Sequence, residues 1–320
     1  MQNGTRLAAV DLGSNSFRLE IGHIHDGQYF RTDYLKETVR LGSGLDDRRL
    51  LTADVMQRGL DCLGRFGQQL AGFAAHQVRA VGTQTLREAL NRDEFASRAA
   101  VALGFPVSVI SGREEARLTF QGVAHLLPHS SERRLVLDIG GRSTELVLGL
   151  GLEARSMDSY RVGSIVWSKL YFPQGQFTAD AFKAAEIGAG AMLERALQTY
   201  RKQHWDAAYG SAGTVGAVSD VLTAAGWPSG FVSRDGLNWL QRELVQARSA
   251  ERLDLPGMKS ERRPVIGGGL SILRAVFDLF EIDQLQHASG GLRHGLICDL
   301  MDAAGEQVNL SPVSVNGSLV

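Results

Sequence analysis

A segment of fifteen residues occurs twice in this chain, and the repetition constrains the fold more than any other feature of the sequence. Residues 8–22 (AAVDLGSNSFRLEIG) and residues 135–149 (LVLDIGGRSTELVLG) align without a gap. The matching positions are Asp11 with Asp138, Gly13 with Gly140, Ser16 with Ser143, Leu19 with Leu146, and Gly22 with Gly149. An internal repeat of this kind predicts a duplicated architecture, in which each half of the chain builds a similar unit.

Each copy has the pattern of a β-hairpin with a polar tip. An apolar run ends at an aspartate, a Gly/Ser turn follows, and alternating apolar residues resume. Backbone N–H groups and hydroxyls in such a turn suit a phosphate, and a hard cation such as Mg²⁺ would offset the repulsion between phosphate and aspartate. A single hairpin of this type is usually only a turn, but two copies in register favour phosphate binding. The two candidate phosphate loops are Gly13, Ser14, Asn15 and Ser16, and Gly140, Gly141, Arg142 and Ser143.

Composition is typical of a globular protein, with 44% hydrophobic and 22% charged residues among 320. The net charge of −1 gives no global basic field, which argues against a nucleic-acid partner. Cys62 and Cys298 form no metal-binding spacing and favour a reducing compartment. The sequence shows no bilayer-spanning stretch and no signal peptide, so we expect a cytoplasmic protein without a membrane partner.

Strand and helix patterns alternate in both halves, which predicts an α/β class with mixed sheets. In the first half we expect a helix that Thr52 caps, with Met56, Leu60, Leu63 and Phe66 as its apolar stripe, and a single helix through Leu86 to Leu103. Pro128 to Arg134 is a polar connector. We therefore expect one lobe over residues 1–128, a second over 129–301, and a tail, 302–320, that packs back on the first. A cleft between the lobes would be the natural ligand site.

Two glutamates follow Ser111 at the start of a predicted helix. Glu114 fits a capping box with Ser111, which is a sufficient structural role. Glu115 is favourably placed on the helix dipole, which would also explain it structurally. Adjacent residues of a helix point in different directions, however, so Glu115 can alternatively face the cleft and deprotonate a water for attack on phosphorus.

Further candidates lie beside Gly/Ser/Thr turns. Arg87 follows the turn at residues 82–85 and suits a phosphate clamp, although most single arginines are solvated. Gly213 and Thr214 lie in a turn before a helix, a place suited to anion binding. Arg18 in the first hairpin corresponds to Glu145 in the second, so one copy offers a cation to phosphate and the other a metal ligand. Arg262 and Arg263 form a basic pair for which an exposed surface is the default expectation.

These motifs together resemble the exopolyphosphatase/guanosine pentaphosphate phosphatase family, which belongs to the actin-like ATPase and sugar-kinase (ASKHA) superfamily. The similarity runs in order from about Leu7 to Met301. It rests on the two hairpins and on the stretches at residues 82–87, 111–117, 209–217 and 261–273. The resemblance implies two actin-like, ribonuclease H-like lobes with the active site in the cleft.

The resemblance also implies roles for individual residues and a magnesium cofactor. Glu115 would be the general base, and Arg87 would bind phosphate. The acids associated with Mg²⁺ would be Asp11, Asp138 and Glu145. The implied reaction releases the terminal phosphate of inorganic polyphosphate, or the 5′ γ-phosphate of guanosine pentaphosphate, to water. Family members also suggest a homodimer.

Two positions depart from the family pattern. The second loop usually has a third glycine where this chain has Arg142, which either adds a phosphate contact or crowds the loop. His294 stands where an acidic residue is common. Longer family members carry additional C-terminal helical domains beyond the region of similarity, so action on very long chains is a separate question.

From the sequence we favour a magnesium-dependent exopolyphosphatase, with guanosine pentaphosphate phosphatase as the alternative that shares its catalytic residues. A sugar or acetate kinase of the same superfamily is a more remote hypothesis, because no sugar-binding motif is evident. A polyphosphate or nucleotide sensor without turnover is the non-enzymatic one, and Arg142 is its only support.

Overall fold

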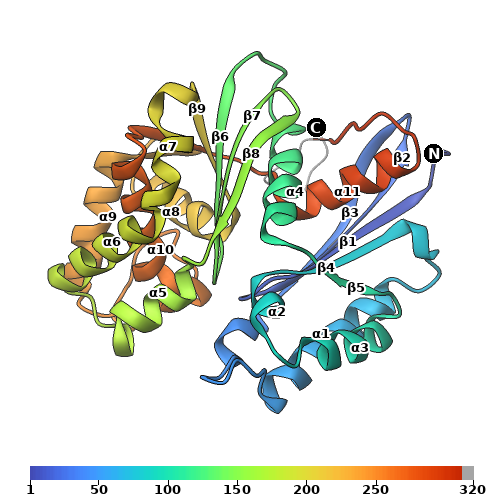
Figure 1. Ribbon diagram of the computed structural model, residues 1–320, viewed down its shortest axis with the longest axis horizontal. Helices are drawn as coiled ribbons and strands as arrows, with labels where there is room; N and C mark the ends of the chain where they lie inside the picture. Colours follow the sequence, from blue (N-terminus) through green and yellow to red (C-terminus); the bar gives the residue numbers. More distant parts are fainter. Residues whose placement is uncertain (312–320) are drawn as a thin grey trace. The chain divides into compact units, whose positions relative to one another are not determined.

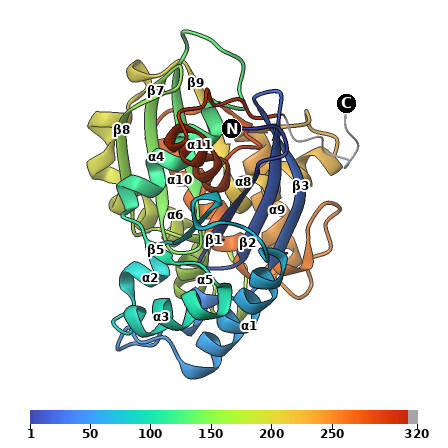
Figure 2. The same ribbon diagram turned by 90° about the vertical axis from the view of Figure 1, so that its right-hand side faces the viewer.

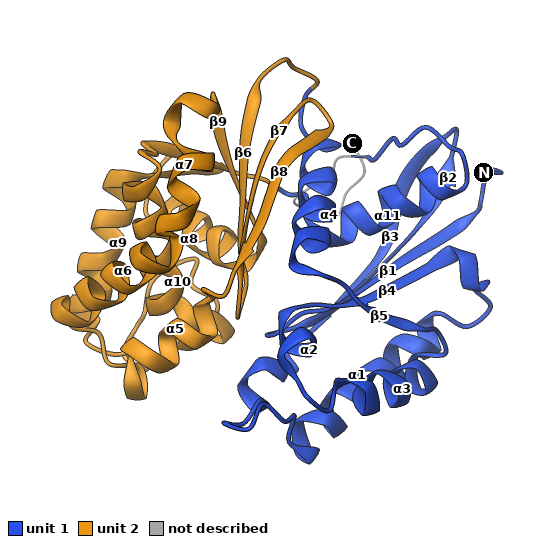
Figure 3. Ribbon diagram, in the orientation of Figure 1, with its two compact units in different colours: residues 1–128, 289–320 blue, residues 129–288 orange. Residues whose placement is uncertain are grey.

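The computed structural model of the protein describes residues 1–311, and the chain forms two compact α/β units (Figure 3). Unit 1 combines Met1–Pro128 with residues 289–311, and unit 2 is the continuous segment His129–Ala288. None of the helices within the described part of the chain has the length and apolar character needed to cross a membrane.

Unit 1 contains a five-stranded mixed sheet in the order β3-β2-β1-β4-β5. The first three strands form an antiparallel meander, seen side by side in Figure 2, and β4 and β5 continue the sheet parallel to β1. The central strand β1 is buried from Leu7 to Leu12, as its continuous apolar run predicts. The bounds are β1 Arg6–Leu12, β2 Phe17–His25, β3 Gln28–Glu37, β4 Val78–Gly82 and β5 Val107–Val109.

Helices cover both faces of this sheet (Figure 1). One face packs on α1 and α3, the other on α4 and α11. The apolar stripe of α1, which ends in Phe66, is buried as expected. The bounds are α1 Ala53–Gln69, α2 Gln84–Glu88, α3 Arg92–Leu103, α4 Gly112–Ala124 and α11 Leu292–Ala303.

The expectation of one helix from Leu86 to Leu103 was wrong, because the chain breaks between α2 and α3. The Asn91 side chain accepts a hydrogen bond from the Leu51 N–H (2.9 Å) and donates one to the Leu51 carbonyl (3.0 Å). Both contacts fix Asn91 outside the helix as the residue before α3. A partner forty residues away in the sequence therefore fixes the residue after which α3 begins.

Unit 2 contains a six-stranded sheet in the order β10-β11-β9-β6-β7-β8. Its main helices lie on one face of the sheet and share one apolar core with it (Figure 1). The strands are β6 Arg133–Ile139, β7 Thr144–Leu150, β8 Glu153–Tyr160, β9 Ala207–Ser211, β10 Phe231–Ser233 and β11 Gln284–His287. The helices are α5 Ser164–Tyr171, α6 Ala179–Leu193, α7 Leu197–Tyr200, α8 Ala212–Ala224, α9 Arg234–Ala247 and α10 Ile266–Leu279.

The two sheets share one topology, which confirms the internal duplication and the α/β class. The order β3-β2-β1-β4-β5 of unit 1 corresponds to β8-β7-β6-β9-β11 of unit 2. The hairpin register is also the same, since Asp11 pairs with Arg18 on β1 and β2, and Asp138 pairs with Glu145 on β6 and β7. The strand β10 is an addition at the edge of unit 2, antiparallel to β11.

The second boundary differs from the one expected, because residues 289–301 belong to unit 1 and not to a lobe ending at 301. Helix α11 places Leu296, Ile297 and Met301 in the apolar cluster of β1 and α4. Residues 304–311, which follow α11, also lie in unit 1, where Leu310 forms a β-bridge with Tyr29 of β3. The rest of the expected tail, 312–320, lies outside the described residues.

Candidate active site

The first candidate phosphate loop is the turn between β1 and β2. A Cβ atom on Gly13 would lie 2.9 Å from the Ser16 carbonyl oxygen, so only glycine permits this closure. The Thr85 hydroxyl donates to the Ser14 hydroxyl (2.7 Å), and the Arg40 N–H donates to the Asn15 carbonyl (2.8 Å). These contacts hold the turn against the segment after β4 and the segment after β3.

Arg18 and Asp11 face each other across the first hairpin. The Arg18 Nη1 lies 3.0 Å from Asp11 Oδ2, and the aspartate side chain is only 5% exposed. The guanidinium therefore lies next to the turn, where a cation favours phosphate binding. Because Asp11 already has this cationic partner, the geometry within unit 1 supports it less strongly as a metal ligand.

Arg87 and Glu115 form an ion pair at the same edge of the sheet. Leu12, Gly82 and Val109 are neighbours in register on β1, β4 and β5, so these parallel strands end together. Arg87 Nη1 lies 2.7 Å from Glu115 Oε2, with side-chain exposures of 17% and 13%. The structure therefore brings Glu115, Arg87 and the first phosphate loop to one edge of unit 1.

Ser111 caps α4 as the sequence predicts, accepting the Glu114 N–H at 3.1 Å. The reciprocal half of the expected capping box is replaced by another contact. The Glu114 carboxylate accepts two hydrogen bonds from Arg117 (2.9 and 2.8 Å), and this arginine lowers the pKa of Glu114. The two adjacent glutamates thus point to different partners, and only Glu115 pairs with Arg87.

The second phosphate loop, between β6 and β7, closes like the first. The Gly140 N–H donates to the Ser143 carbonyl (2.9 Å), and a Cβ atom on Gly140 would lie 3.2 Å from that oxygen. The start of α5 holds the loop from behind. Ser164 donates to the Gly140 carbonyl from its N–H (2.9 Å) and its hydroxyl (3.1 Å), and the Ile165 N–H donates to the Gly141 carbonyl (2.8 Å).

Arg142 fits into this loop because a glycine lies against it. A Cβ atom on Gly163 would overlap the Arg142 backbone. The departure from a third glycine in the loop therefore does not open the turn, which keeps its Gly140–Ser143 hydrogen bond. Gly163 immediately precedes α5, so the same close approach brings the start of that helix to the loop.

Two carboxylates face each other across β6 and β7. Asp138 and Glu145 are register partners, and Glu145 is 2% exposed while accepting a hydrogen bond from the Ser159 hydroxyl (2.7 Å). Opposed carboxylates on neighbouring strands repel each other unless a cation or proton lies nearby. No group of three or more metal-ligating side chains occurs in residues 1–311, but Mg²⁺ needs only one or two carboxylates beside phosphate oxygens and water.

The turn before α8 lies at the same edge of the unit 2 sheet. Asp138 is in register with Ser211 on β9, and the Thr214 hydroxyl donates to the Ile139 carbonyl (3.0 Å). Ala212 has a left-handed backbone with φ of 62°, a conformation that costs an L-residue about 1 kcal/mol or more. Strain of this kind is concentrated at functional turns, which supports the prediction for Gly213 and Thr214.

Arg262 is a residue whose place the sequence did not predict. Its guanidinium lies directly on Gly213, where a Cβ atom would overlap it. The side chain is half-buried, whereas the expected position was an exposed surface. The only sequence indication was its basic character near a turn. Its position adds a second cation, besides Arg142, to the candidate phosphate-binding residues of unit 2.

Comparison with known proteins identifies the family. The sequence profile of the Ppx/GppA phosphatase family matches residues 24–304. The chain belongs to this family. Proteins named guanosine-5′-triphosphate,3′-diphosphate pyrophosphatase are similar over most of the chain. The protein of Vibrio parahaemolyticus is 41% identical over 92% of this chain, and that of Vibrio vulnificus is 42% identical over 93%.

Solved structures of the Ppx/GppA family have the same fold. An exopolyphosphatase from Cytophaga hutchinsonii is 25% identical, with a TM-score of 0.82 over 95% of this chain and 99% of its own. The Aquifex aeolicus PPX-GPPA enzyme is 25% identical, with a TM-score of 0.75 over 92% of this chain and 99% of its own. The chain spans only 59% and 60% of the length of the two Vibrio relatives.

Proposed function

We propose that the protein is a phosphoanhydride hydrolase that removes the 5′ γ-phosphate of guanosine pentaphosphate, with water as the acceptor. The observation that carries this proposal is the partly buried Glu115–Arg87 ion pair beside the first candidate phosphate loop. A carboxylate in that place suits a general base, and an arginine suits a contact to phosphate oxygens. The names of the relatives with 41–42% identity favour the nucleotide over polyphosphate as substrate.

In this proposal each residue set has a separate task. Glu115 orients a water and accepts its proton, while Arg18, Arg87 and the two loops hold phosphate oxygens. Mg²⁺ would be held by Asp138 and Glu145, whose facing carboxylates fit a hard cation, and would neutralise charge on the phosphate chain. Asp11 is a weaker candidate for the metal, because Arg18 already pairs with its carboxylate.

Exopolyphosphatase activity is the second candidate. It is supported by the likeness to the Cytophaga hutchinsonii exopolyphosphatase, which is lower in identity but covers nearly all of that chain. The chemistry would be the same, since both reactions cleave a terminal phosphoanhydride. The two candidate substrates differ only in the group that carries the terminal phosphate, which is a guanosine nucleotide in one case and a chain of further phosphates in the other.

The test is phosphate release from guanosine pentaphosphate and from short and long polyphosphate, measured in parallel with Mg²⁺ and with EDTA. We expect faster release from the nucleotide, and loss of release in EDTA. A preference for polyphosphate would replace the leading substrate by the second candidate. Absence of release from all three substrates would overturn the hydrolase proposal itself.

The base is tested by Glu115→Gln, which keeps the shape of the side chain but cannot accept the proton. We expect kcat to fall by at least about 100-fold while substrate binding is retained. Glu114→Gln is the matched control, because the neighbouring carboxylate contacts Arg117 and not Arg87. Equal activity of the two variants would show that the base lies elsewhere.

A further inference from the structure

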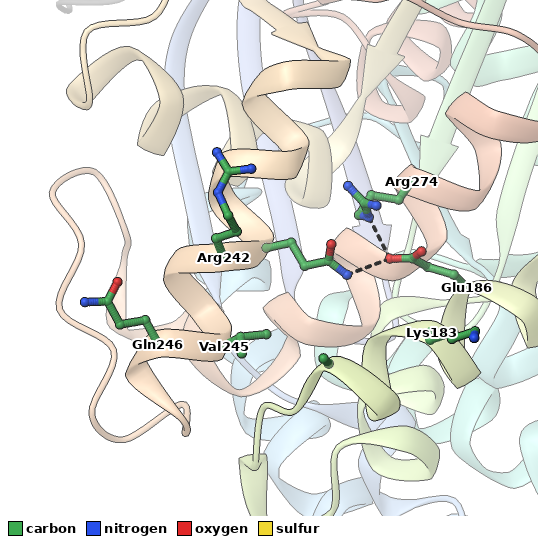
Figure 4. Close-up of a pocket in the computed structure, with 8 residues that line it drawn as sticks. Lys183, Glu186, Arg242, Val245, Gln246 and Arg274 are labelled. Carbon is green, nitrogen blue, oxygen red and sulfur yellow. Dashed lines mark hydrogen bonds and ion pairs between the residues drawn. The ribbon is translucent and has the colours of Figure 1, made fainter.

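Unit 2 contains a pocket of about 430 Å³ that includes none of the residues assigned to phosphate loops or catalysis. It lies among three helices, α6, α9 and α10 (Figure 4). Its size is within the range of small-molecule sites in proteins. The lining residues are Ala179, Lys183, Glu186, Gln241, Arg242, Val245, Gln246 and Arg274.

The polar side of the pocket is organised by hydrogen bonds from two helices to one carboxylate. Glu186 Oε1 accepts from Arg274 Nε (2.6 Å) and from Gln241 Nε2 (2.9 Å). Arg274 Nη1 also donates to Asn238 Oδ1 (2.5 Å). The Arg274 and Glu186 side chains are only 16% and 20% exposed. These contacts fix the positions of both groups before any ligand arrives.

Two further cations border the pocket. Lys183 on α6 and Arg242 on α9 form no ion pair or hydrogen bond through their side chains among residues 1–311. The two residues come from different helices and lie apart from each other in the lining (Figure 4). The lining therefore carries three cations and one carboxylate, a formal excess of two positive charges in a chain whose net charge is −1.

The start of α6 adds a further preference for anions. Ala179 is the first residue of this fifteen-residue helix and borders the pocket. The Thr178 hydroxyl caps the Ala181 N–H (3.1 Å). The N-terminal end of a helix carries partial positive charge, and it acts here together with the three cationic side chains.

We propose that this pocket binds an oligophosphate anion, a chain of at least two phosphate groups. Lys183 and Arg242 lie apart on different helices, so a ligand that contacts both must be extended and carry several charges. A single phosphate would leave most of the volume empty. Ala179 and Val245 provide apolar surface beside the charges, which also suits a nucleoside attached to the chain.

The pocket is a second site, because none of its lining residues belongs to the candidate phosphate loops or to the Glu115–Arg87 pair. Gly269 of α10 packs against Thr214, in the turn at the start of α8. A Cβ atom added to Gly269 would lie 2.7 Å from the threonine methyl group. Arg274 is five residues further along the same helix, about 7.5 Å along its axis. Occupancy of the pocket does not require the hydrolytic function proposed above, so failure of one proposal leaves the other standing.

The experiment is hydrogen exchange of the full chain in EDTA, titrated with two non-hydrolysable probes. Methylenebisphosphonate presents two linked phosphonates alone, and guanosine 5′-(β,γ-imido)triphosphate presents a phosphate chain on a nucleoside. We expect either probe to slow exchange in residues 179–186 and 241–246. Slowing by both probes would mean that the phosphate chain suffices, and slowing by the nucleotide alone would identify a nucleotide as the ligand.

The dependence on charge is tested with the double variant Lys183→Ala/Arg242→Ala. Both side chains are exposed on helix surfaces, so the variant is expected to fold, which thermal denaturation checks. The probe concentration at half-effect should rise by at least about tenfold, since charge-assisted contacts are the stronger hydrogen bonds. The matched control is Lys169→Ala/Arg252→Ala, which removes two exposed cations of unit 2 outside the pocket and should change nothing.

Two results would overturn the proposal. One is the absence of slowed exchange at the pocket with both probes in the unaltered chain. The other is slowed exchange with the same concentration dependence in the double variant as in the unaltered chain, because binding would then not depend on the cations.

Discussion

Glu20 is a fully buried carboxylate on β2, two residues after Arg18. Its oxygens lie 3.4 Å from Arg293 Nε and 3.7 Å from His294 Nε2, both at the start of α11. Burial alone would raise the pKa of Glu20, but the nearby His294 and Arg293 charges outweigh it and lower this pKa. Burial also lowers the pKa of His294, in spite of the attraction of Glu20. The unusual histidine of this family member therefore belongs to a buried polar cluster.

These two shifts predict how the stability of unit 1 depends on pH. His294 takes up a proton more readily in the unfolded chain, where its pKa is near 6.5. The stability that the neutral, buried His294 contributes is therefore complete above about pH 6.5 and is lost as pH falls below that value. Glu20 acts in the same direction at lower pH, since its lowered pKa contributes stability above about 4.5 that is lost as pH falls further.

The measurement is the free energy of unfolding from urea titrations at pH 7.5, 6.5 and 5.5. We expect a decline toward pH 5.5 in the unaltered chain and a shallower decline in His294→Gln. His76→Gln is the control, because His76 is exposed on the surface of unit 1. An equal decline in all three proteins would show that His294 does not titrate on unfolding in this range.

At the scale of elements, a close helix crossing joins α4 and α11. A Cβ atom on Gly295 would overlap the Leu118 backbone, and one on Gly122 would overlap the Gly291 carbonyl. Backbone atoms cannot yield as a flexible side chain does. The two helices therefore approach as closely as they do only because these positions lack side chains.

Replacing Gly295 by alanine should destabilise the protein, although the same change stabilises an ordinary helix. An alanine in place of an interior helical glycine normally adds about 1 kcal/mol to the free energy of unfolding. Here we expect a loss of about 2–4 kcal/mol, because the helices must move apart. Gly64→Ala in α1 is the matched control, since no atom lies within 4 Å of its Cβ position, and it should be neutral or stabilising. Urea denaturation of both variants measures the difference, and similar effects would contradict a tight crossing.

Sequence patterns predicted the elements that depend on residues close together in the chain. Both hairpins, the α1 stripe and the Ser111 cap follow from neighbouring residues, and the structure confirms them. Helix α5 was missed because its eight residues are too few to show a clear period. The Arg262 contact with Gly213 was missed for another reason, since the two residues lie far apart in the sequence and no local pattern marks their contact.

At the scale of the whole chain, the repeat predicts the topology of both units correctly but assigns the last helix to the wrong unit. It correctly predicted two units with one topology and one hairpin register. By the same logic α11, which follows β11 as α4 follows β5, should belong to the second unit. Instead it packs in unit 1, because Leu296, Ile297 and Met301 join the cluster of Leu7 and Leu118.

The discontinuous composition of unit 1 predicts different behaviour for the two halves when they are expressed separately. Residues 129–288 contain a complete apolar core of their own and should fold alone. Residues 1–128 lack α11 and would expose the surface that Leu296, Ile297 and Met301 cover. Each such side chain contributes about 1.5–3 kcal/mol when buried, so their joint loss is comparable with the total stability of a domain.

The measurement is cooperative urea unfolding of three fragments, together with binding of a dye that detects exposed apolar surface. We expect residues 129–288 to unfold cooperatively and residues 1–128 to bind the dye without a cooperative transition. Joining residues 1–128 to 289–311 through a short Gly/Ser linker should restore the transition, because the linker returns α11 to the sheet it covers. Cooperative unfolding of residues 1–128 alone would show instead that β1 and α4 hold their apolar cluster without α11, and that the return of the chain to unit 1 is not needed for its fold.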